Sequence, residues 1–280
     1  MSEPIAGYRS RIVDDELDEL LPDVSAIAVE GAKAIGKTVT ASRRAATIHR
    51  LDDPSERSIA LAEPRRLLEG PHPVLIDEWQ RVPESWDLVR RAVDQRASSG
   101  PGSYLLTGSA SPLNPPTHSG AARIVRVRMR TLTLPERGIT TPSVSLRDLL
   151  GGTQPALEGR TEVRLEDYVD EILASGFPGL RGLSGRALRS QLDGYIERIV
   201  DRDFDDMGHR VRRPEALLGW MRAYAAASST IASYEKIRDA ATSGEVERPT
   251  RKATGPYRAV LERLWVVDPE PAWLPTRSRL

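Results

Sequence analysis

The sequence predicts an α/β core with a largely parallel sheet, followed by a helical region that ends in a winged-helix-like pattern. Three observations support this prediction. Short apolar segments alternate with segments of helical spacing, which is typical of parallel strands joined by helices. A glycine-bounded loop follows the first apolar segment. Beyond a stretch rich in Thr, Pro, Ser and Gly, apolar residues recur only at helical spacing.

The elements of the predicted core follow one another over residues 1–140. An amphipathic opening segment closes at residues 17–22, the first strand is expected at 25–29, and a loop at 31–38 leads into a helix over 38–48. A helix is expected from Pro83 to Gln95, because proline is favoured where a helix begins. Further strands are expected at 47–51, 73–77, 103–108 and 123–130.

The second part of the chain is predicted to consist of a linker over 141–162 and a helical region over 163–280. Helices are expected at 165–175, 185–204, 214–227, 233–241 and 254–264, and a strand at 266–267. The last three helices and the strand give the winged-helix-like pattern. We also expect the chain to stop within this second domain, leaving Leu261, Leu264, Trp265 and Trp273 partly uncovered.

Composition excludes several classes of protein. The chain has no cysteine, so it has no disulfide, iron–sulfur cluster or thiolate zinc site, and we expect a reducing, cytoplasmic location. Forty basic and forty acidic residues cancel, so no overall field draws the chain to nucleic acid. No apolar run approaches the roughly 20 residues that span a bilayer, and we expect no membrane partner.

Residues 31–38 match the phosphate-binding pattern G-x-x-x-x-G-K-[ST] in full, which predicts a P-loop NTPase core. The glycines permit backbone angles that aim successive N–H groups into one concavity, and the following helix adds its positive end. The lysine reaches the β- and γ-phosphates, and the threonine hydroxyl is a ligand for Mg²⁺. We expect the nucleotide to be bound by Gly31, Ala32, Lys33, Ala34, Ile35, Gly36, Lys37 and Thr38.

Two acids end the apolar segment at 73–77. An acid at the carboxyl end of a buried strand lies beside the phosphate loop in α/β sheets. Asp77 is therefore the second expected ligand for Mg²⁺, and Glu78 is expected to orient or deprotonate the attacking water. The alternative is an ordinary strand end with solvated acids.

Two further positions are candidates for contact with the terminal phosphate. Thr107, with Ser109 beside it, ends an apolar strand and is expected to report the nucleotide state; the alternative is capping of the strand end. Arg123 enters the last strand and is expected to act on the transition state. The plainer interpretation of the arginines on that strand is an exposed face that prevents edge pairing.

Adenine is the expected base. Guanine recognition commonly uses an Asn-Lys-x-Asp motif, but Asn114 is the only asparagine and a proline follows it. We therefore expect ATP and Mg²⁺ as the ligands.

Four motifs together resemble those of the prokaryotic AAA-type ATPases that carry a C-terminal domain of unknown function. They are the segments 30–38, 75–80, 105–111 and 128–138, and segments 168–179 and 195–203 resemble the start of the second domain. The resemblance implies ATP binding, a catalytic Glu78 after Asp77 and a sensor at Thr107. Family members have Gly-Arg before the fifth strand, whereas this chain has Ala122-Arg123, so only the arginine carries over.

Two functions remain open from the sequence. The first is a slow ATPase that acts as a nucleotide-dependent switch for a partner. The second is a non-hydrolysing ATP-binding regulator whose winged helix binds DNA or protein; only the first requires Glu78. A small-molecule kinase is disfavoured, because the paired acids favour water as the acceptor.

If the winged-helix-like region binds DNA, the positive charges that contact the DNA would come from Arg248, Arg251, Lys252 and Arg258, although neighbouring acidic residues offset part of this charge. Oligomerisation stays open.

Overall fold

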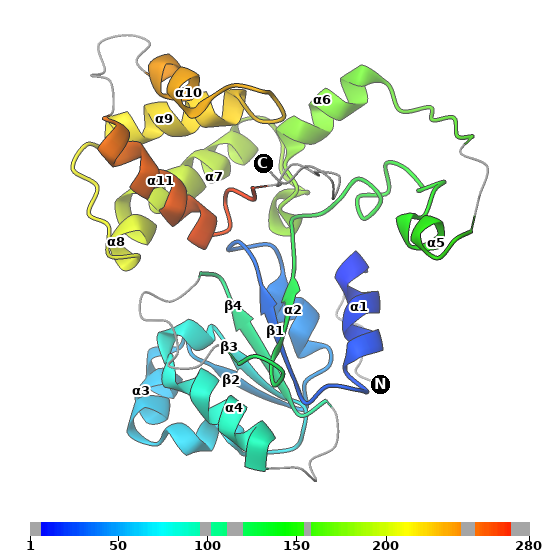
Figure 1. The fold of residues 1–280 in the computed structure, drawn as a ribbon, viewed down its shortest axis with the longest axis vertical. Helices are drawn as coiled ribbons and strands as arrows, with labels where there is room; N and C mark the ends of the chain where they lie inside the picture. The colour runs from blue at the N-terminus through cyan, green and yellow to red at the C-terminus, as the bar shows by residue number, and fades with distance from the viewer. Residues whose placement is uncertain (1–6, 96–101, 111–119, 154–157, 242–249, 270–280) are drawn as a thin grey trace, which may run out of the picture. The chain divides into compact units, whose positions relative to one another are not determined.

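The computed structural model describes residues 7–95, 102–110, 120–153, 158–241 and 250–269. For residues 251–253 it describes the backbone and not the side chains. The chain forms two compact units (Figure 1). The first comprises residues 1–109 and 114–191, and the second comprises 110–113 and 192–280. The two compact units divide the chain at other positions than the predicted domain boundaries at 140 and 163. Those domain boundaries remain a prediction.

In the part of the chain that is described, the first unit contains one sheet of five parallel strands in the order β2-β3-β4-β1-β5. The predicted parallel α/β core is confirmed. Because all strands run the same way, their carboxyl ends meet at one edge of the sheet. The strands are β1 (Ala26–Glu30), β2 (Thr47–Arg50), β3 (Val74–Asp77), β4 (Tyr104–Gly108) and β5 (Val125–Arg128).

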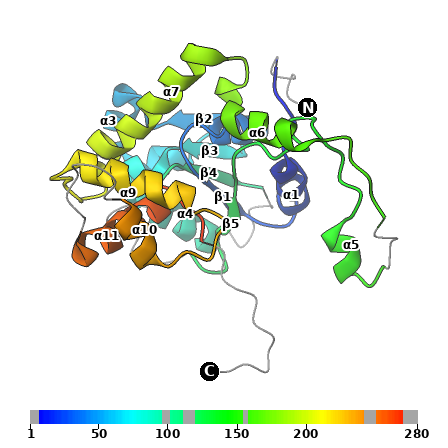
Figure 2. The same cartoon turned by 90° about the horizontal axis from the view of Figure 1, so that it is seen from above.

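Helices cover both faces of this sheet (Figure 2). On one face, Trp86, Leu106 and Ile76 are fully buried in a core to which α3, η1 and α4 contribute. Alternate strand residues such as Ile27 and Leu105 face the other way and are also fully buried. On that side α2 packs on β1, β3 and β4, and α1 packs on β5. These helices are α1 (Ile12–Leu20), α2 (Lys37–Ser42), α3 (Pro54–Ala62), η1 (Pro64–Leu68), η2 (Trp79–Arg81) and α4 (Glu84–Gln95).

Helices α2, α3 and α5 (Leu146–Leu150) differ from the sequence-based prediction, and α5 forms within the predicted linker over 141–162. The helix expected over 38–48 ends at Ser42, because residues 47–50 pair with β3 as a strand. Helix α3 was missed, although Asp53 caps it by accepting from the backbone N–H groups of Ser55 and Glu56, and Pro54 begins it. An aspartate followed by a proline is a recognisable start signal for a helix.

The chain after β5 continues within the first unit. It forms α5 (Leu146–Leu150), α6 (Leu165–Ala174) and η3 (Pro178–Leu180), and α7 (Gly185–Arg198) leads towards the second unit. The N–H of Leu132 donates to the carbonyl of Gly176 at 2.8 Å. Glu171 accepts from Arg137 at 3.0 Å and from Arg181 at 2.8 Å. Residues 171–181 are therefore tied to the segment that follows β5.

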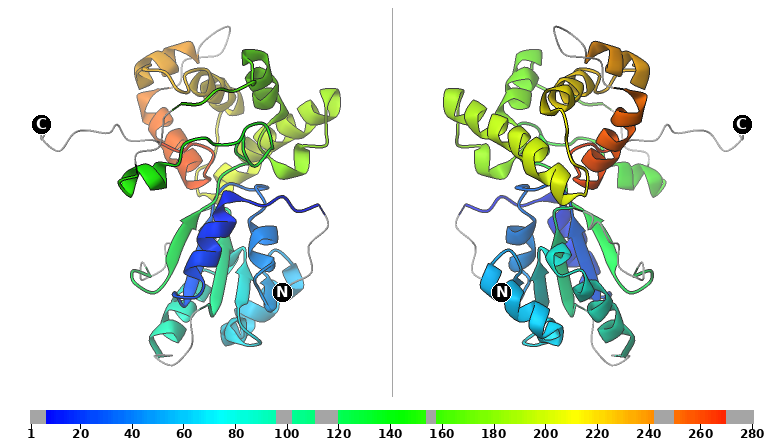
Figure 3. Two further views of the ribbon diagram at one scale, coloured as in Figure 1. Left: turned by 90° about the vertical axis from the view of Figure 1, so that its right-hand side faces the viewer. Right: turned by 90° about the vertical axis from the view of Figure 1, so that its left-hand side faces the viewer.

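The second unit is helical, as predicted. It contains η4, a π-helical stretch (Ile199–Asp203), with α8 (Phe204–Asp206), α9 (Pro214–Ala226), α10 (Tyr234–Ala240) and α11 (Arg251–Arg263). Figure 3 shows the helices of this unit gathered together. Their core includes Phe204, Leu217 and Trp220. Among the described residues, no helix has the length and apolar character needed to cross a membrane.

The end of α11 departs from two expectations. Residues 266–267 are not a strand, because Trp265 adopts φ 61° and the N–H groups of Val266 and Val267 turn back to donate to the carbonyl of Leu261 at 2.9 and 3.3 Å. The expectation that Leu261 and Leu264 are uncovered is wrong, since both lie in the core of the second unit at 2% and 4% exposure. Trp273 lies outside the described residues.

Candidate functional site

The carboxyl edge of the sheet brings together most of the predicted site residues. The loop at 31–36 follows β1, Glu78 follows β3, and Ser109 follows β4. In the register of the sheet, β4 lies between β1 and β3, with Thr107 opposite Asp77 on one side and Val29 on the other. The phosphate loop and the two acids are consequently neighbours, although some forty residues of sequence separate them.

The conformation of the loop requires its two glycines. A Cβ at Gly31 would lie 2.2 Å from the carbonyl oxygen of Met129 and 2.6 Å from the Ile35 side chain, so no larger residue fits there. Gly36 adopts φ 99° and directly precedes α2, a backbone region that glycine enters without steric cost. Ala34 adopts φ 63°, which is unfavourable for a residue with a Cβ. The loop is thus held in a tight, partly strained turn.

Lys37 is buried at 5% exposure inside this loop. Its ammonium group donates to the carbonyl oxygens of Gly31 at 2.9 Å and Ala32 at 2.7 Å. Burial lowers the pKa of Lys37 to about 8, although the nearby carboxylates of Glu78 and Asp77 act to raise it. The structure therefore places a readily titrated cation where the sequence predicts a phosphate contact.

Asp77 and the two predicted hydroxyl residues form one cluster. The Thr38 hydroxyl donates to Oδ1 of Asp77 at 2.8 Å, and the Thr107 hydroxyl donates to the same oxygen. Asp77 and Thr107 are almost fully buried, at 4% and 0% exposure. The carboxylate and the Thr38 hydroxyl are hard oxygen donors in mutual contact beside a phosphate loop, and this donor set fits Mg²⁺.

Glu78 is held by a second set of polar contacts. Its Oε2 accepts from the Ser109 hydroxyl at 2.8 Å and from Nε2 of Gln80 at 2.6 Å, while Gln80 also donates to Ser109 at 3.2 Å. Glu78 itself adopts φ 57°, a left-handed conformation that turns the chain sharply out of β3 into η2. Backbone and side-chain contacts together fix the direction of the carboxylate.

The arginines near β5 divide between the two ends of that strand. Arg123 precedes the strand and pairs with Asp94 of α4 at 2.8 Å, with 45% of its side chain exposed. Arg128 ends the strand opposite Glu30, the residue directly before the phosphate loop. Arg123 lies in the turn before β5, and the four residues of the strand span about 10 Å, so the structure does not bring Arg123 to the carboxyl edge of its own chain. Arg128 lies at that edge, and its charge contributes to lowering the pKa of Lys37.

The roles of Gln80 and Glu30 were not predicted from the sequence, and Ser109 was named there without a specific contact. A signal for Gln80 was present: a polar residue two positions after the acid pair, between tryptophan and arginine. Burial raises the pKa of Glu30, while Arg126 and Arg128 act to lower it. No sequence pattern marks Glu30, because its surroundings come from the pairing of β1 with β5.

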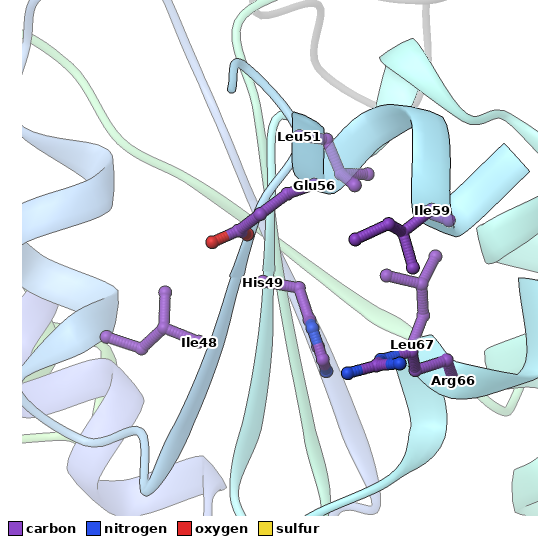
Figure 4. Close-up of a pocket in the computed structure, with 8 residues that line it drawn as sticks. Ile48, His49, Leu51, Glu56, Ile59, Arg66 and Leu67 are labelled. Atoms are coloured by element: carbon purple, nitrogen blue, oxygen red, sulfur yellow. The ribbon is translucent and has the colours of Figure 1, made fainter. Parts of the chain in front are cut away.

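A pocket of about 180 Å³ lies elsewhere in the first unit, beside β2 and α3 (Figure 4). Its lining combines apolar residues such as Leu51 and Ile59 with His49, Glu56 and Arg66. It includes none of the phosphate-loop residues, and we assign it no part in the site.

The loop, the acids after β3 and the parallel sheet define this chain as a protein of the P-loop nucleotide-binding class. Residues 23–137 match the family model of an AAA domain, and residues 165–279 match the model of a domain of unknown function. The chain therefore combines an AAA-type ATPase domain with a second domain whose function is not known. This confirms the resemblance inferred from the four sequence motifs.

Two solved structures are similar to the chain. The Walker-type ATPase PABY2304 of Pyrococcus abyssi has a TM-score of 0.50 at 15% identity, with 92% of this chain and 90% of that chain covered. The replication initiator DnaA bound to AMPPCP and single-stranded DNA has a TM-score of 0.37 at 13% identity, with 89% and 86% covered. The first likeness supports the ATPase fold. No curated protein sequence matches the chain.

Proposed function

We propose that this chain binds ATP with Mg²⁺ and hydrolyses it slowly, as a nucleotide-dependent switch. The observation that carries the proposal is the pair of clusters at the carboxyl edge of the sheet. One cluster joins Thr38, Asp77 and Thr107, and the other holds Glu78 through Ser109 and Gln80. A purely structural phosphate loop has no need of the second cluster.

Binding is assigned to the loop from Gly31 to Thr38, with Thr107 behind it. Lys37 places its charge against the terminal phosphates, and we assign Thr38 and Asp77 as the protein's ligands for Mg²⁺. When bound, the metal neutralises phosphate charge. The chain's own contribution is to hold these oxygens in place and to exclude water from a largely buried edge.

Glu78 is assigned as the general base. A water oxygen forms a bond to the γ-phosphorus while the bond from that phosphorus to the bridging oxygen of ADP breaks. The proton of the water passes to the Glu78 carboxylate, and the products are ADP and inorganic phosphate. Ser109 and Gln80 keep the carboxylate from rotating away from the loop.

A catalytic role for Arg123 then requires a second subunit. Its distance from the carboxyl edge follows from the direction of β5, which places Arg123 before the strand and Arg128 at its end. An arginine that acts on a neighbouring subunit makes turnover per subunit rise with protein concentration. Arg123→Ala should abolish that rise while ATP affinity is retained; a turnover number equal to that of the wild type would remove Arg123 from the mechanism.

We assign the nucleotide-dependent change in conformation to Ser109 and Ala110, the residues that directly follow β4. Ser109 contacts Glu78, and the next residue, Ala110, is counted with the core of the second unit. A displacement of Ser109 on hydrolysis is therefore passed to the second unit through one peptide bond. Differential affinity for a partner in the ATP and ADP states follows from such a displacement.

A second candidate function is a non-hydrolysing regulator with a winged-helix-like module. The observation that favours it is the core shared by α9 and α11, which Ala241 joins directly after α10, together with the packing of α10 on α9. Arg258 pairs with Glu262 at 2.7 Å and lies over the Tyr234 ring, so its charge is already engaged. Arg248 and the side chains of Arg251 and Lys252 lie outside the described residues. Because Arg258 is engaged, we favour a protein over DNA as the partner of this module.

Calorimetry and turnover together test the two functions. ATP–Mg²⁺ should bind to the wild type, and Lys37→Ala should lose most of that affinity, because the variant lacks the charge that faces the phosphates. Equal ATP affinity in the two proteins would contradict the proposal that the phosphate loop binds ATP. ATP binding by the wild type with no release of phosphate, with or without DNA, would favour the regulator.

A further inference from the structure

A buried arginine, Arg11, directly precedes α1 and contacts the phosphate loop from outside. Arg11 is 5% exposed and lies before the residues that match the AAA domain. Its guanidinium donates to the carbonyl oxygens of Ile35 at 2.8 Å and Arg130 at 2.7 Å. Its Nε donates to Oε1 of Glu136 at 3.0 Å. One side chain thus joins the phosphate loop, the chain after β5 and the segment that contains Glu136.

The contact with Ile35 bears directly on the loop's binding surface. In a planar trans peptide the C=O and the N–H of the following residue point in opposite directions. Because Arg11 holds the Ile35 carbonyl on its own side, the N–H of Gly36 points to the other side. Ile35 lies between two residues with left-handed backbone angles, Ala34 and Gly36. A tight turn of this kind needs an external partner to keep one conformation.

Glu136 fixes the position of the guanidinium. Its carboxylate also accepts from the backbone N–H groups of Ile12 and Thr133, each at 2.7 Å. The side chains of Arg11 and Glu136 are 4% and 6% exposed. Burial acts to raise the pKa of Glu136, but the N–H groups of Thr133 and Ile12 and the charge of Arg11 outweigh it, so the pKa is lowered. The Glu136 carboxylate therefore stays ionised at neutral pH.

A separate network fixes α1 against α2, the helix that follows the loop. Asp14 accepts from the Arg11 N–H at 2.7 Å and pairs with Arg44 at 2.9 Å, and it also accepts from the Tyr8 hydroxyl. Tyr8 in turn lies 2.9 Å from the Thr40 hydroxyl of α2. The backbone of Arg11 is thus held by contacts that do not involve its guanidinium, so changing that side chain leaves α1 anchored.

We propose that Arg11 is a positioning residue for the nucleotide: by holding the Ile35 carbonyl, it keeps the phosphate loop in the conformation that receives the β- and γ-phosphates of ATP. The inference rests on the proposed ATP binding. It assigns the segment before the AAA domain a role in phosphate recognition, through the loop and not through direct contact with ATP.

The test compares Arg11→Lys and Arg11→Ala with Arg147→Ala, a control in an exposed ion pair with Glu19. Isothermal calorimetry with ATP–Mg²⁺ and with AMP should show ATP affinity about tenfold or more lower in both Arg11 variants, as expected for loss of a charge-assisted hydrogen bond. AMP, which lacks the two outer phosphates, should bind as it does to the wild type. Guanidinium ion at millimolar concentration should restore ATP affinity in Arg11→Ala and change nothing in the control.

The outcomes separate this inference from the proposed function. If the wild type does not bind ATP, the proposed function fails. If the wild type binds ATP and Lys37→Ala does not, but Arg11→Lys binds ATP like the wild type, the role of Arg11 is overturned. A fall in thermal stability with unchanged ATP affinity in the folded fraction overturns it as well, since that result marks a merely structural residue. If Arg11→Ala does not fold, Glu136→Gln takes its place with a smaller expected loss of ATP affinity.

Discussion

The pKa of Lys37 leads to a quantitative prediction for the pH dependence of ATP binding. Burial lowers this pKa to about 8 in the free protein, opposed by Glu78 and Asp77 and assisted by Lys33 and Arg128. Only the protonated ammonium attracts the phosphates. Bound ATP should therefore raise the pKa of Lys37, and binding above pH 8 must take up a proton.

The size of the effect follows from the protonated fraction of Lys37. With a pKa of about 8, the group is about 90% charged at pH 7 and about 10% charged at pH 9. ATP affinity should thus be almost constant up to about pH 7.5 and then fall, reaching roughly a tenfold loss at pH 9. The sign is fixed because the free protein binds fewer protons than the complex over this range.

Isothermal calorimetry in buffers of different ionisation enthalpy measures both the affinity and the number of protons taken up. Lys37→Arg is the matched control, because a guanidinium stays charged throughout and its ATP affinity should not follow the same curve. A wild-type affinity for ATP that stays constant from pH 7 to 9 would show that ATP binding does not depend on the protonation of Lys37. Identical pH dependence in Lys37→Arg would assign the titration to another group.

Three further predictions address the loop, the carboxylate and the second unit. Gly31→Ala should lower ATP affinity at least about tenfold by calorimetry, because its Cβ would lie 2.2 Å from the Met129 carbonyl, while Gly182→Ala, with open space around it, should have no effect. Ser109→Ala should lower turnover about tenfold at unchanged ATP affinity, since Glu78 loses one hydrogen-bond donor. A turnover equal to that of the wild type would show that Ser109 has no part in catalysis. Leu217→Ala should destabilise the second unit by about 2–5 kcal/mol in denaturant melts, and a parallel loss of ATP affinity would show that binding depends on that unit.

Local patterns in the sequence were sufficient to predict most of the core. The apolar segments before Asp77 and Gly108 became strands at the expected places, because parallel strands buried on both faces have unbroken apolar sequences. The phosphate loop could be identified because its residue types are dictated by backbone angles and charge. The helix predicted over 38–48 was too long: it overlapped the strand predicted at 47–51, and α2 ends at Ser42, ahead of β2.

The contacts that complete the site are non-local and could not be predicted. Arg11, Ile35 and Glu136 lie far apart in sequence and meet only because α1 packs beside β5. Arg123 was chosen as the arginine where the chain enters β5 and from the resemblance to the family's Gly-Arg, whereas the pairing of β5 with β1 places Arg128 opposite Glu30. The strand expected at 266–267 failed for a different reason: apolar, β-branched residues suggested a strand, but the backbone turns back onto Leu261.

In the proposed mechanism, Glu78, held by Ser109 and Gln80, activates water for ATP hydrolysis. Single-turnover hydrolysis of ATP by the wild type and by Glu78→Gln, with excess protein and Mg²⁺, tests it most directly. Glutamine keeps the shape of the side chain but does not accept the proton, so the variant should bind ATP as tightly as the wild type and convert it at least about a hundredfold more slowly. Hydrolysis of bound ATP at the wild-type rate by Glu78→Gln would show that Glu78 is not the general base.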